Sequence, residues 1–148
     1  FKGYPINLLT VHISGGMSML TRAREAAHAI KSKVIGVSLL TSLDQKDVEK
    51  VFFNDIRKVA DNLFDLAKEA NMDGIVCSAH ELKYARTNIP NLLKIVPGIR
   101  LSSDNDDQKR VMSPGEALKL GANHLVIGRP ITESKHPNAE LEKIYETL

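Results

Sequence analysis

Residues 113–132 read SPGEALKLGANHLVIGRPIT, and they contain the pattern of one helix followed by one strand. Ser113 offers a side-chain oxygen for a helix N-cap, the proline after it fits the first helical position, and Glu116 can complete a capping box. Gly121 then ends the helix, because glycine readily adopts the conformation found at helix C-termini. The apolar run 125–127 has the length and composition of a short buried strand.

The same alternation of strand and helix recurs along the whole chain. Apolar runs typical of buried strands occupy residues 7–13, 34–40, 74–77, 92–96 and 125–127. Segments with apolar residues at helical spacing separate or follow them, at residues 17–30, 44–53, 56–70, 81–86 and 113–121, and in a final helix carrying Leu141, Ile144, Tyr145 and Leu148 on one side. Five successive strand–helix units predict parallel pairing, because parallel neighbours need a helical crossover between them.

Two architectures suit such a series: an open doubly wound sheet, or part of a (β/α)8 TIM barrel. The open sheet usually binds a nucleotide through a Gly-x-Gly-x-x-Gly turn after its first strand. Here only Ser14, Gly15 and Gly16 follow the first run, so the barrel is favoured. We expect residues 1–148 to form a single α/β domain. Because a full barrel needs about 250 residues, this domain would be the C-terminal part of a barrel. It would contain about five strand–helix units, and roughly three units would precede Phe1.

Composition narrows the class of protein. The 148 residues are 43% hydrophobic and 26% charged, which is typical of a soluble globular domain. The 20 basic and 18 acidic side chains are interspersed, so no basic stripe indicates nucleic-acid binding. No apolar run approaches the roughly 18 residues of a membrane span, and no signal peptide precedes the first strand. A single cysteine, Cys77, excludes an internal disulfide and fits a reducing cytoplasm.

Small and basic residues follow two of the predicted strands. The fourth run leads into Gly98 and Arg100, and the fifth leads into Gly128 and Arg129. Glycine lets an anion approach the backbone amide, and a guanidinium offers paired donors to phosphate oxygens. Barrels bind ligands at the carboxyl ends of their strands, so these residues predict a phosphate site. The alternative is that glycine and proline simply end the last strand while the arginine faces water.

Other reactive residues favour structural roles. Cys77 and His80 have the spacing of a nucleophile and a base, but a cysteine in a short apolar strand is more typical of a core residue. His12, within the first run, is interpreted as a half-buried structural histidine. The five histidines form no metal-binding pattern.

Six short motifs resemble orotidine 5′-phosphate decarboxylase in its bacterial form, from about residue 8 to about residue 134. They are TVHISGG at 10–16, LTSL at 40–43, DGIVCSA at 73–79, VPGIR at 96–100, DQKR at 107–110 and VIGRPIT at 126–132. The resemblance implies a cytoplasmic barrel homodimer that converts orotidine 5′-monophosphate to UMP and CO₂ in pyrimidine synthesis. It also implies that the reaction uses no metal and no organic cofactor.

The resemblance also assigns substrate-binding residues. The family's phosphate site falls on Gly128 and Arg129, and Arg100 belongs with them. Gln108, in the polar segment 101–110, is expected to reach the ligand from a closing loop, although that segment can also be read as a solvated connector. Thr41 matches the threonine that contacts the nucleotide.

One departure from the family pattern concerns catalysis. The family's Asp-x-Lys-x-x-Asp motif, whose lysine donates a proton to the pyrimidine carbon, has no copy in this sequence. The catalytic residues are therefore expected upstream of Phe1, and the chain as written is expected to bind nucleotide without turning it over. Two alternatives stay open: a related phosphosugar enzyme, of the ribulose-phosphate epimerase or keto-gulonate-phosphate decarboxylase type, and an inactive structural fragment.

Overall fold

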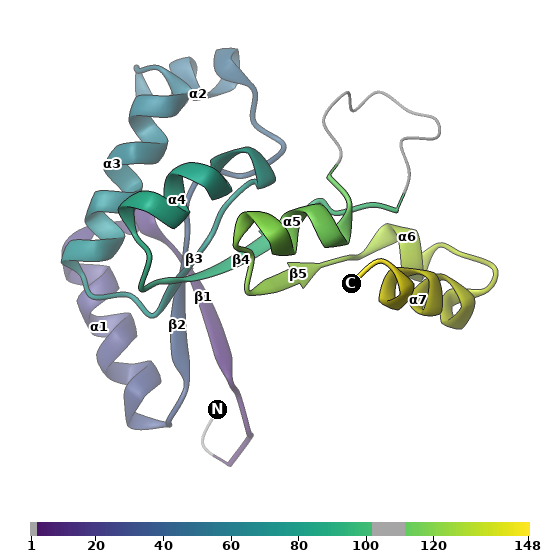
Figure 1. Cartoon of the computed structure of the whole chain (residues 1–148). Helices are drawn as coiled ribbons and strands as arrows, with labels where there is room; N and C mark the ends of the chain where they lie inside the picture. The colour runs from purple at the N-terminus through teal and green to yellow at the C-terminus, as the bar shows by residue number, and fades with distance from the viewer. Residues whose placement is uncertain (1–2, 102–111) are drawn as a thin grey trace.

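The computed structural model describes residues 3–101 and 112–148, and within them five strands form one parallel sheet (Figure 1). The strands are β1 (Leu8–His12), β2 (Lys33–Val37), β3 (Gly74–Val76), β4 (Leu93–Pro97) and β5 (His124–Val126). All five predicted strands are present. Their order in the sheet follows the sequence without a reversal, so every crossover steps in the same direction. A doubly wound sheet reverses its order at a switch point, so this sheet has the winding of a barrel.

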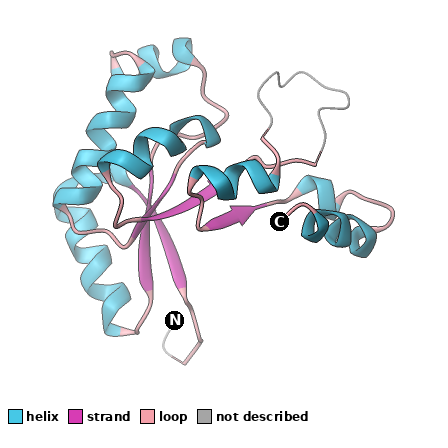
Figure 2. Cartoon of the chain, in the orientation of Figure 1, coloured by secondary structure: helices cyan, strands magenta, loops and turns pink. Residues whose placement is uncertain are grey.

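Helices connect the strands and lie along one face of the sheet (Figure 2). They are α1 (Gly16–Ala29), α2 (Gln45–Phe52), α3 (Ile56–Glu69), α4 (Leu82–Asn88), α5 (Pro114–Leu120), α6 (Arg129–Thr132) and α7 (Pro137–Glu146), with 3-10 turns at Ile13–Gly15 and Ala79–Glu81. The main core lies between these helices and the sheet, where Val34, Ile75 and Val96 are buried against helical residues.

Alternation along the strands defines a second face, called here the inner face, which no described helix covers. In the centre of this face the side chains still bury one another: Ile35 is 0% exposed and Ile95 is 7% exposed. Gly74 makes room for this packing, because a Cβ at Gly74 would lie 2.9 Å from the Cδ1 of Ile35. The two edge strands differ, since Leu8 of β1 is 37% exposed and Val126 of β5 is 48% exposed.

Capping residues begin several helices, and the cap at Ser113 is the predicted one. Asp44 forms a capping box with Asp47 at the start of α2, and Ser113 forms one with Glu116 at the start of α5. Gly121 ends α5 with a φ of 108°, a left-handed conformation that side chains rarely adopt. Asp55 caps α3 by accepting from the backbone N–H of Arg57 at 2.8 Å, although the sequence pattern alone did not single it out.

The Ser113–Glu116 box makes stability depend on pH. The Glu116 carboxylate accepts hydrogen bonds from the N–H of Ser113 at 3.0 Å and from its hydroxyl at 2.8 Å, and these bonds lower the pKa of Glu116. A lowered pKa in the folded state means that this stabilisation is present above the unfolded pKa and is lost as pH falls through the folded value. Replacing Ser113 with alanine is expected to cost about 1 kcal/mol near pH 7 and less near pH 3.

Urea unfolding at the two pH values measures this difference. Glu116→Gln is the matched control, because the amide oxygen still accepts from Ser113 but does not titrate over this range. Its stability is expected to depend less on pH than that of the unchanged chain. Equal pH profiles for Glu116→Gln and the unchanged chain would contradict the assigned role.

Two details differ from the sequence prediction. The short helix α6 is not predicted, because a single turn of four residues is too short to show a periodic pattern. The predicted apolar side of the last helix is mostly uncovered: Ile144 is 5% exposed, but Tyr145 is 65% exposed, and Leu148, which follows the end of α7, is 56% exposed. The reason is position, because α7 follows β5, which is an edge strand of the sheet that the described residues form.

Candidate phosphate site at the strand ends

Gly128 and Arg129 leave the carboxyl end of β5 and begin α6. The Gly128 carbonyl accepts from the amides of Ile131 and Thr132, at 2.9 and 3.0 Å, which fixes the backbone at this point. Among the described residues, and apart from its two neighbours in the chain, no atom lies within 4 Å of the position that a Cβ would take on Gly128. Both residues are exposed, so an anion can reach the backbone and the guanidinium together.

Arg100 stands just beyond the end of the neighbouring strand, β4. Gly98 turns the chain there with a φ of 78°, and Ile99 is buried at 1% exposure. The N–H of Arg100 donates to the carbonyl of Met112 at 3.2 Å, so its backbone is anchored. Arg100 itself is half-buried.

The two arginine-bearing segments leave the sheet next to each other. Pro97 at the end of β4 pairs with Val126 at the end of β5, and neighbouring strands lie about 4.8 Å apart. The fold therefore brings Arg100 and Arg129 to adjacent strand ends at one edge of the sheet. Two guanidinium groups beside an open glycine can receive a phosphate dianion by charge and by paired hydrogen bonds.

Thr41 lies at the same edge of the sheet but farther along it. It is exposed in the turn after β2, and β3 separates that strand from β4. The start of this loop is held by Ser38, whose buried hydroxyl donates to the carbonyl of Val76 at 2.9 Å. A ligand that contacts both Thr41 and Arg129 must extend along the carboxyl ends of the strands from β2 to β5. Gln108 lies outside the described residues, so its role stays a prediction.

Cys77 belongs to the core, as predicted. It is 0% exposed, and burial raises the pKa of its thiol to about 12. The thiol is therefore protonated near pH 7 and cannot act as a nucleophile. His12 differs from its prediction, because it is exposed on the inner face of β1. An edge strand has a neighbour on one side only, which leaves this histidine uncovered.

Two charged side chains, the half-buried Glu81 and the buried Lys94, were missed by the sequence interpretation. The Glu81 carboxylate accepts from the N–H of Ser78 at 2.6 Å, and burial raises its pKa. Lys94 is 4% exposed and donates from Nζ to the carbonyl of Pro90 at 2.8 Å, and burial lowers its pKa. Lys94 alternates with Ile95 along β4, which puts it on the helix-covered face. That alternation is the signal that could have predicted its burial.

The described ranges, 3–101 and 112–148, contain no group of three or more His, Cys, Asp or Glu side chains arranged to hold a metal ion. No helix in this part of the chain has both the length and the apolar character needed to cross a membrane.

The winding of the sheet and the residues at its carboxyl edge define a segment of a (β/α) barrel with a candidate anion site in the usual ligand-binding position. A family model described as "Orotidine 5'-phosphate decarboxylase / HUMPS family" matches residues 3–144. The chain belongs to this family, as the sequence motifs predicted.

Relatives and solved structures agree with the family and with the fold. A protein from Ehrlichia chaffeensis named orotidine 5′-phosphate decarboxylase is 45% identical over 143 residues, which cover 94% of this chain and 62% of that protein. One of the same name from Wolbachia pipientis is 40% identical, over 99% of this chain and 66% of that protein. The crystal structure of orotidine 5′-phosphate decarboxylase from Lactobacillus acidophilus matches with a TM-score of 0.80 and 30% identity, over 96% of this chain and 63% of that one.

The chain thus spans less than two thirds of the length of these relatives. The match to the Sulfolobus solfataricus enzyme, with a TM-score of 0.65 and 21% identity, supports the fold alone. Together these matches confirm the prediction of an α/β chain that forms part of a TIM barrel.

Proposed function

We propose that this chain is the phosphate-binding, carboxyl-terminal part of an orotidine 5′-phosphate decarboxylase, which converts orotidine 5′-monophosphate to UMP in pyrimidine biosynthesis. Family membership and the names of the relatives support this reaction. The observation that carries the proposal is the juxtaposition of Arg100 with Gly128 and Arg129 at the ends of two adjacent parallel strands.

Each site residue has a distinct proposed role. The amide of Gly128 and the guanidinium of Arg129 bind the 5′-phosphate, and Arg100 adds positive charge at the neighbouring strand end. Gln108 reaches the ligand from the segment after β4, and Thr41 contacts the nucleotide nearer the middle of the sheet. Because the phosphate is not the reacting group, these residues supply binding and orientation and donate no proton to the reacting carbon.

The chemical step needs groups that these residues do not provide. Loss of CO₂ leaves a carbanion on the pyrimidine ring, and a positioned acid must protonate that carbon. In the family this acid is the lysine of Asp-x-Lys-x-x-Asp, a motif that the 148 residues do not contain. We therefore propose that they contribute nucleotide binding, while the parent enzyme catalyses the reaction.

We predict that the 148-residue polypeptide binds UMP but does not decarboxylate orotidine 5′-monophosphate. Loss of the substrate's absorbance measures turnover, and calorimetric titration with UMP measures binding. Turnover above the rate in buffer would show that the missing motif is dispensable. Absence of UMP binding by a folded chain would contradict the phosphate site.

A related phosphosugar enzyme is the second candidate, because such barrels hold a phosphate at the same strand ends. Titration with ribulose 5-phosphate separates the two. UMP is expected to bind more tightly, because Thr41 is assigned to the nucleotide. Tighter binding of ribulose 5-phosphate would instead favour the hypothesis of a phosphosugar enzyme.

The remaining proposals concern assembly and location. We propose that residues 1–148 belong to one domain, that the parent enzyme is a homodimer, and that it acts in the cytoplasm without a metal or organic cofactor. The sharing of one sheet by all five strands supports the single domain. The resemblance to the family supports the homodimer, the cytoplasmic location and the reaction without a metal or organic cofactor.

A further inference from the structure

The last turn of the chain lies against the first turn of α5 (Figure 1). Gly115 is the second residue of α5, and a Cβ at this position would overlap the carbonyl oxygen of Thr147. Alanine is a better helix former than glycine, so helix formation alone does not account for a glycine here. The available space does, because the backbone after α7 approaches α5 more closely than a side chain at residue 115 would allow.

The turn that ends α7 is ordered where it makes this contact. The N–H of Thr147 donates to the carbonyl of Ile144 at 3.0 Å, and its hydroxyl donates to the same oxygen at 2.7 Å. Ile144 is 5% exposed, so the turn is attached to a buried residue. The carbonyl of Thr147 therefore meets Gly115 as part of a hydrogen-bonded turn.

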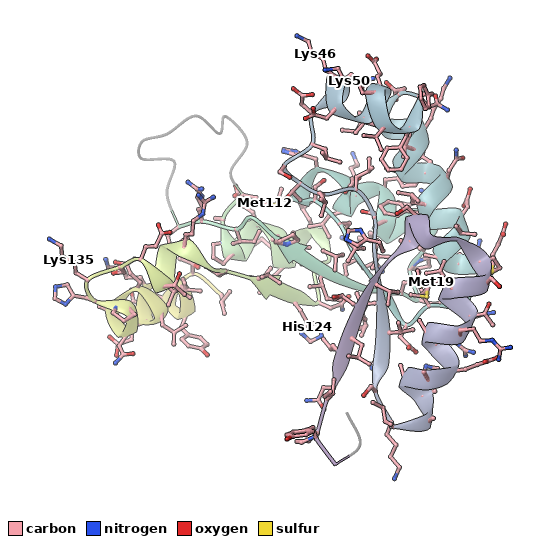
Figure 3. All side chains as sticks on the ribbon, turned by 180° about the vertical axis from the view of Figure 1, so that it is seen from behind. Met19, Lys46, Lys50, Met112, His124 and Lys135 are labelled. Atoms are coloured by element: carbon pink, nitrogen blue, oxygen red, sulfur yellow. The ribbon has the colours of Figure 1, made fainter. Side chains whose placement is uncertain are left out.

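The first turn of α5 determines where the backbone of Arg100 lies. Met112 lies directly before this helix (Figure 3), and its carbonyl accepts from the N–H of Arg100 at 3.2 Å. Pro114 is buried, and the N–H of Ser113 donates to the Glu116 carboxylate at 3.0 Å. Met112 is therefore held close to the helix, and a displacement of the first turn would loosen the backbone of Arg100.

These contacts join the two strand ends of the candidate phosphate site by a second route. Arg129 begins α6, α6 is followed by α7, and the turn that ends α7 contacts Gly115. From Gly115 the first turn of α5 leads back to Met112 and Arg100. The segments that carry Arg100 and Arg129 are thus linked through α7 and α5, as well as through the pairing of β4 with β5.

We propose that Gly115 is a positioning residue for the phosphate site. By leaving room for the carbonyl of Thr147, it lets the turn that ends α7 hold the first turn of α5, which fixes the backbone of Arg100. Gly115 acts through Arg100 and is assigned no contact with the ligand. This inference deepens the proposed function and rests on it for the ligand, but the link between Gly115 and Arg100 is measurable without nucleotide.

Two variants remove the same contact from opposite sides. Gly115→Ala introduces a methyl group for which there is no room, and deletion of residues 147–148 removes the carbonyl that occupies the space. Amide hydrogen exchange followed by NMR is expected to be about tenfold faster at the N–H of Arg100 in each variant. The N–H of Ser38, which donates to a β3 carbonyl at 3.2 Å, is the internal reference and is expected to exchange at an unchanged rate.

The double variant distinguishes one shared contact from two independent effects. Because both changes remove the same contact, exchange at Arg100 in the double variant is expected to be no faster than in either single variant. Additive acceleration in the double variant would overturn the proposal. Unchanged or slower exchange at Arg100 in the single variants would also overturn it, and so would equal acceleration at Ser38, which would indicate a general loss of stability.

Calorimetric titration with UMP tests the consequence for binding. Gly115→Ala is expected to weaken UMP binding about fivefold and to leave uridine binding unchanged, because the effect reaches the ligand through Arg100. Tyr145→Ala is the matched control, since it changes a 65% exposed side chain in the last turn of α7, and it is expected to alter neither exchange nor binding.

The two proposals fail in different ways. Failure of the unchanged chain to bind UMP would contradict the phosphate site and the positioning role with it. If the unchanged chain binds UMP and Gly115→Ala binds it equally well, only the positioning role is overturned. An equal loss of UMP affinity in Tyr145→Ala would likewise overturn the role of Gly115 and leave the phosphate site standing.

Discussion

Replacing Arg129 with alanine is expected to weaken UMP binding about 100-fold. A guanidinium that binds a phosphate bidentately makes two charge-assisted hydrogen bonds, which together stabilise the complex by about 3 kcal/mol. Arg129 is exposed, and within the described residues no carboxylate forms an ion pair with it, so its removal leaves the fold intact. Calorimetric titration with UMP measures the loss, and titration with uridine, which lacks the phosphate, is expected to show none.

Two substitutions serve as controls for this result. Arg129→Lys keeps the charge but loses the paired geometry, so we expect an intermediate affinity. Arg22→Ala removes another exposed arginine, on α1, where it pairs with Glu25 at 3.0 Å, and is expected to leave UMP binding unchanged. If Arg22→Ala weakens binding as much as Arg129→Ala, the effect is one of overall charge and the assigned site is wrong.

Replacing Phe64 with alanine is expected to destabilise the fold by about 3–5 kcal/mol. Phe64 is 1% exposed on α3, and its ring centroid lies 6.0 Å from that of Tyr84 on α4. Its removal leaves a cavity where these two helices meet above the sheet. Urea unfolding followed by circular dichroism measures the change in the free energy of unfolding.

Phe53 provides the matched control, because it carries the same side chain in the opposite environment. It is 89% exposed at the end of α2, in a left-handed conformation with a φ of 55°. Phe53→Ala is expected to change stability by less than about 0.5 kcal/mol. Comparable losses from both substitutions would mean that the buried environment of Phe64 is not what stabilises the fold.

The sequence predicted local structure well because local structure depends on nearby residues. The capping boxes at Asp44 and Ser113 and the helix end at Gly121 each depend on residues a few positions apart. The five strands followed from short apolar runs, and their parallel pairing followed from the helices between them. Helix α6 was not predicted, because a helix of one turn is too short to show helical periodicity in the sequence.

The candidate site was predictable only in part. Glycine and arginine after a strand indicated an anion site, and family motifs named Thr41, Arg100, Gly128 and Arg129. The half-buried position of Glu81 and the burial of Lys94 depend on contacts between elements, whereas residue type alone predicts that both side chains are exposed. Charged side chains are usually exposed, and only the packing around the 3-10 turn and β4 reverses that rule here.

By itself, the sequence determined the class of fold, the family and the residue types at each strand end, because these depend on periodicity, caps and motifs along the chain. Only the tertiary structure decided which strand ends are neighbours, and so that Arg100 and Arg129 follow adjacent strands. It also decided which apolar residues stay uncovered, since exposure depends on the elements that pack on both sides of each strand. In the five-stranded sheet that the described residues form, the central side chains are buried and those of the two edge strands are more exposed.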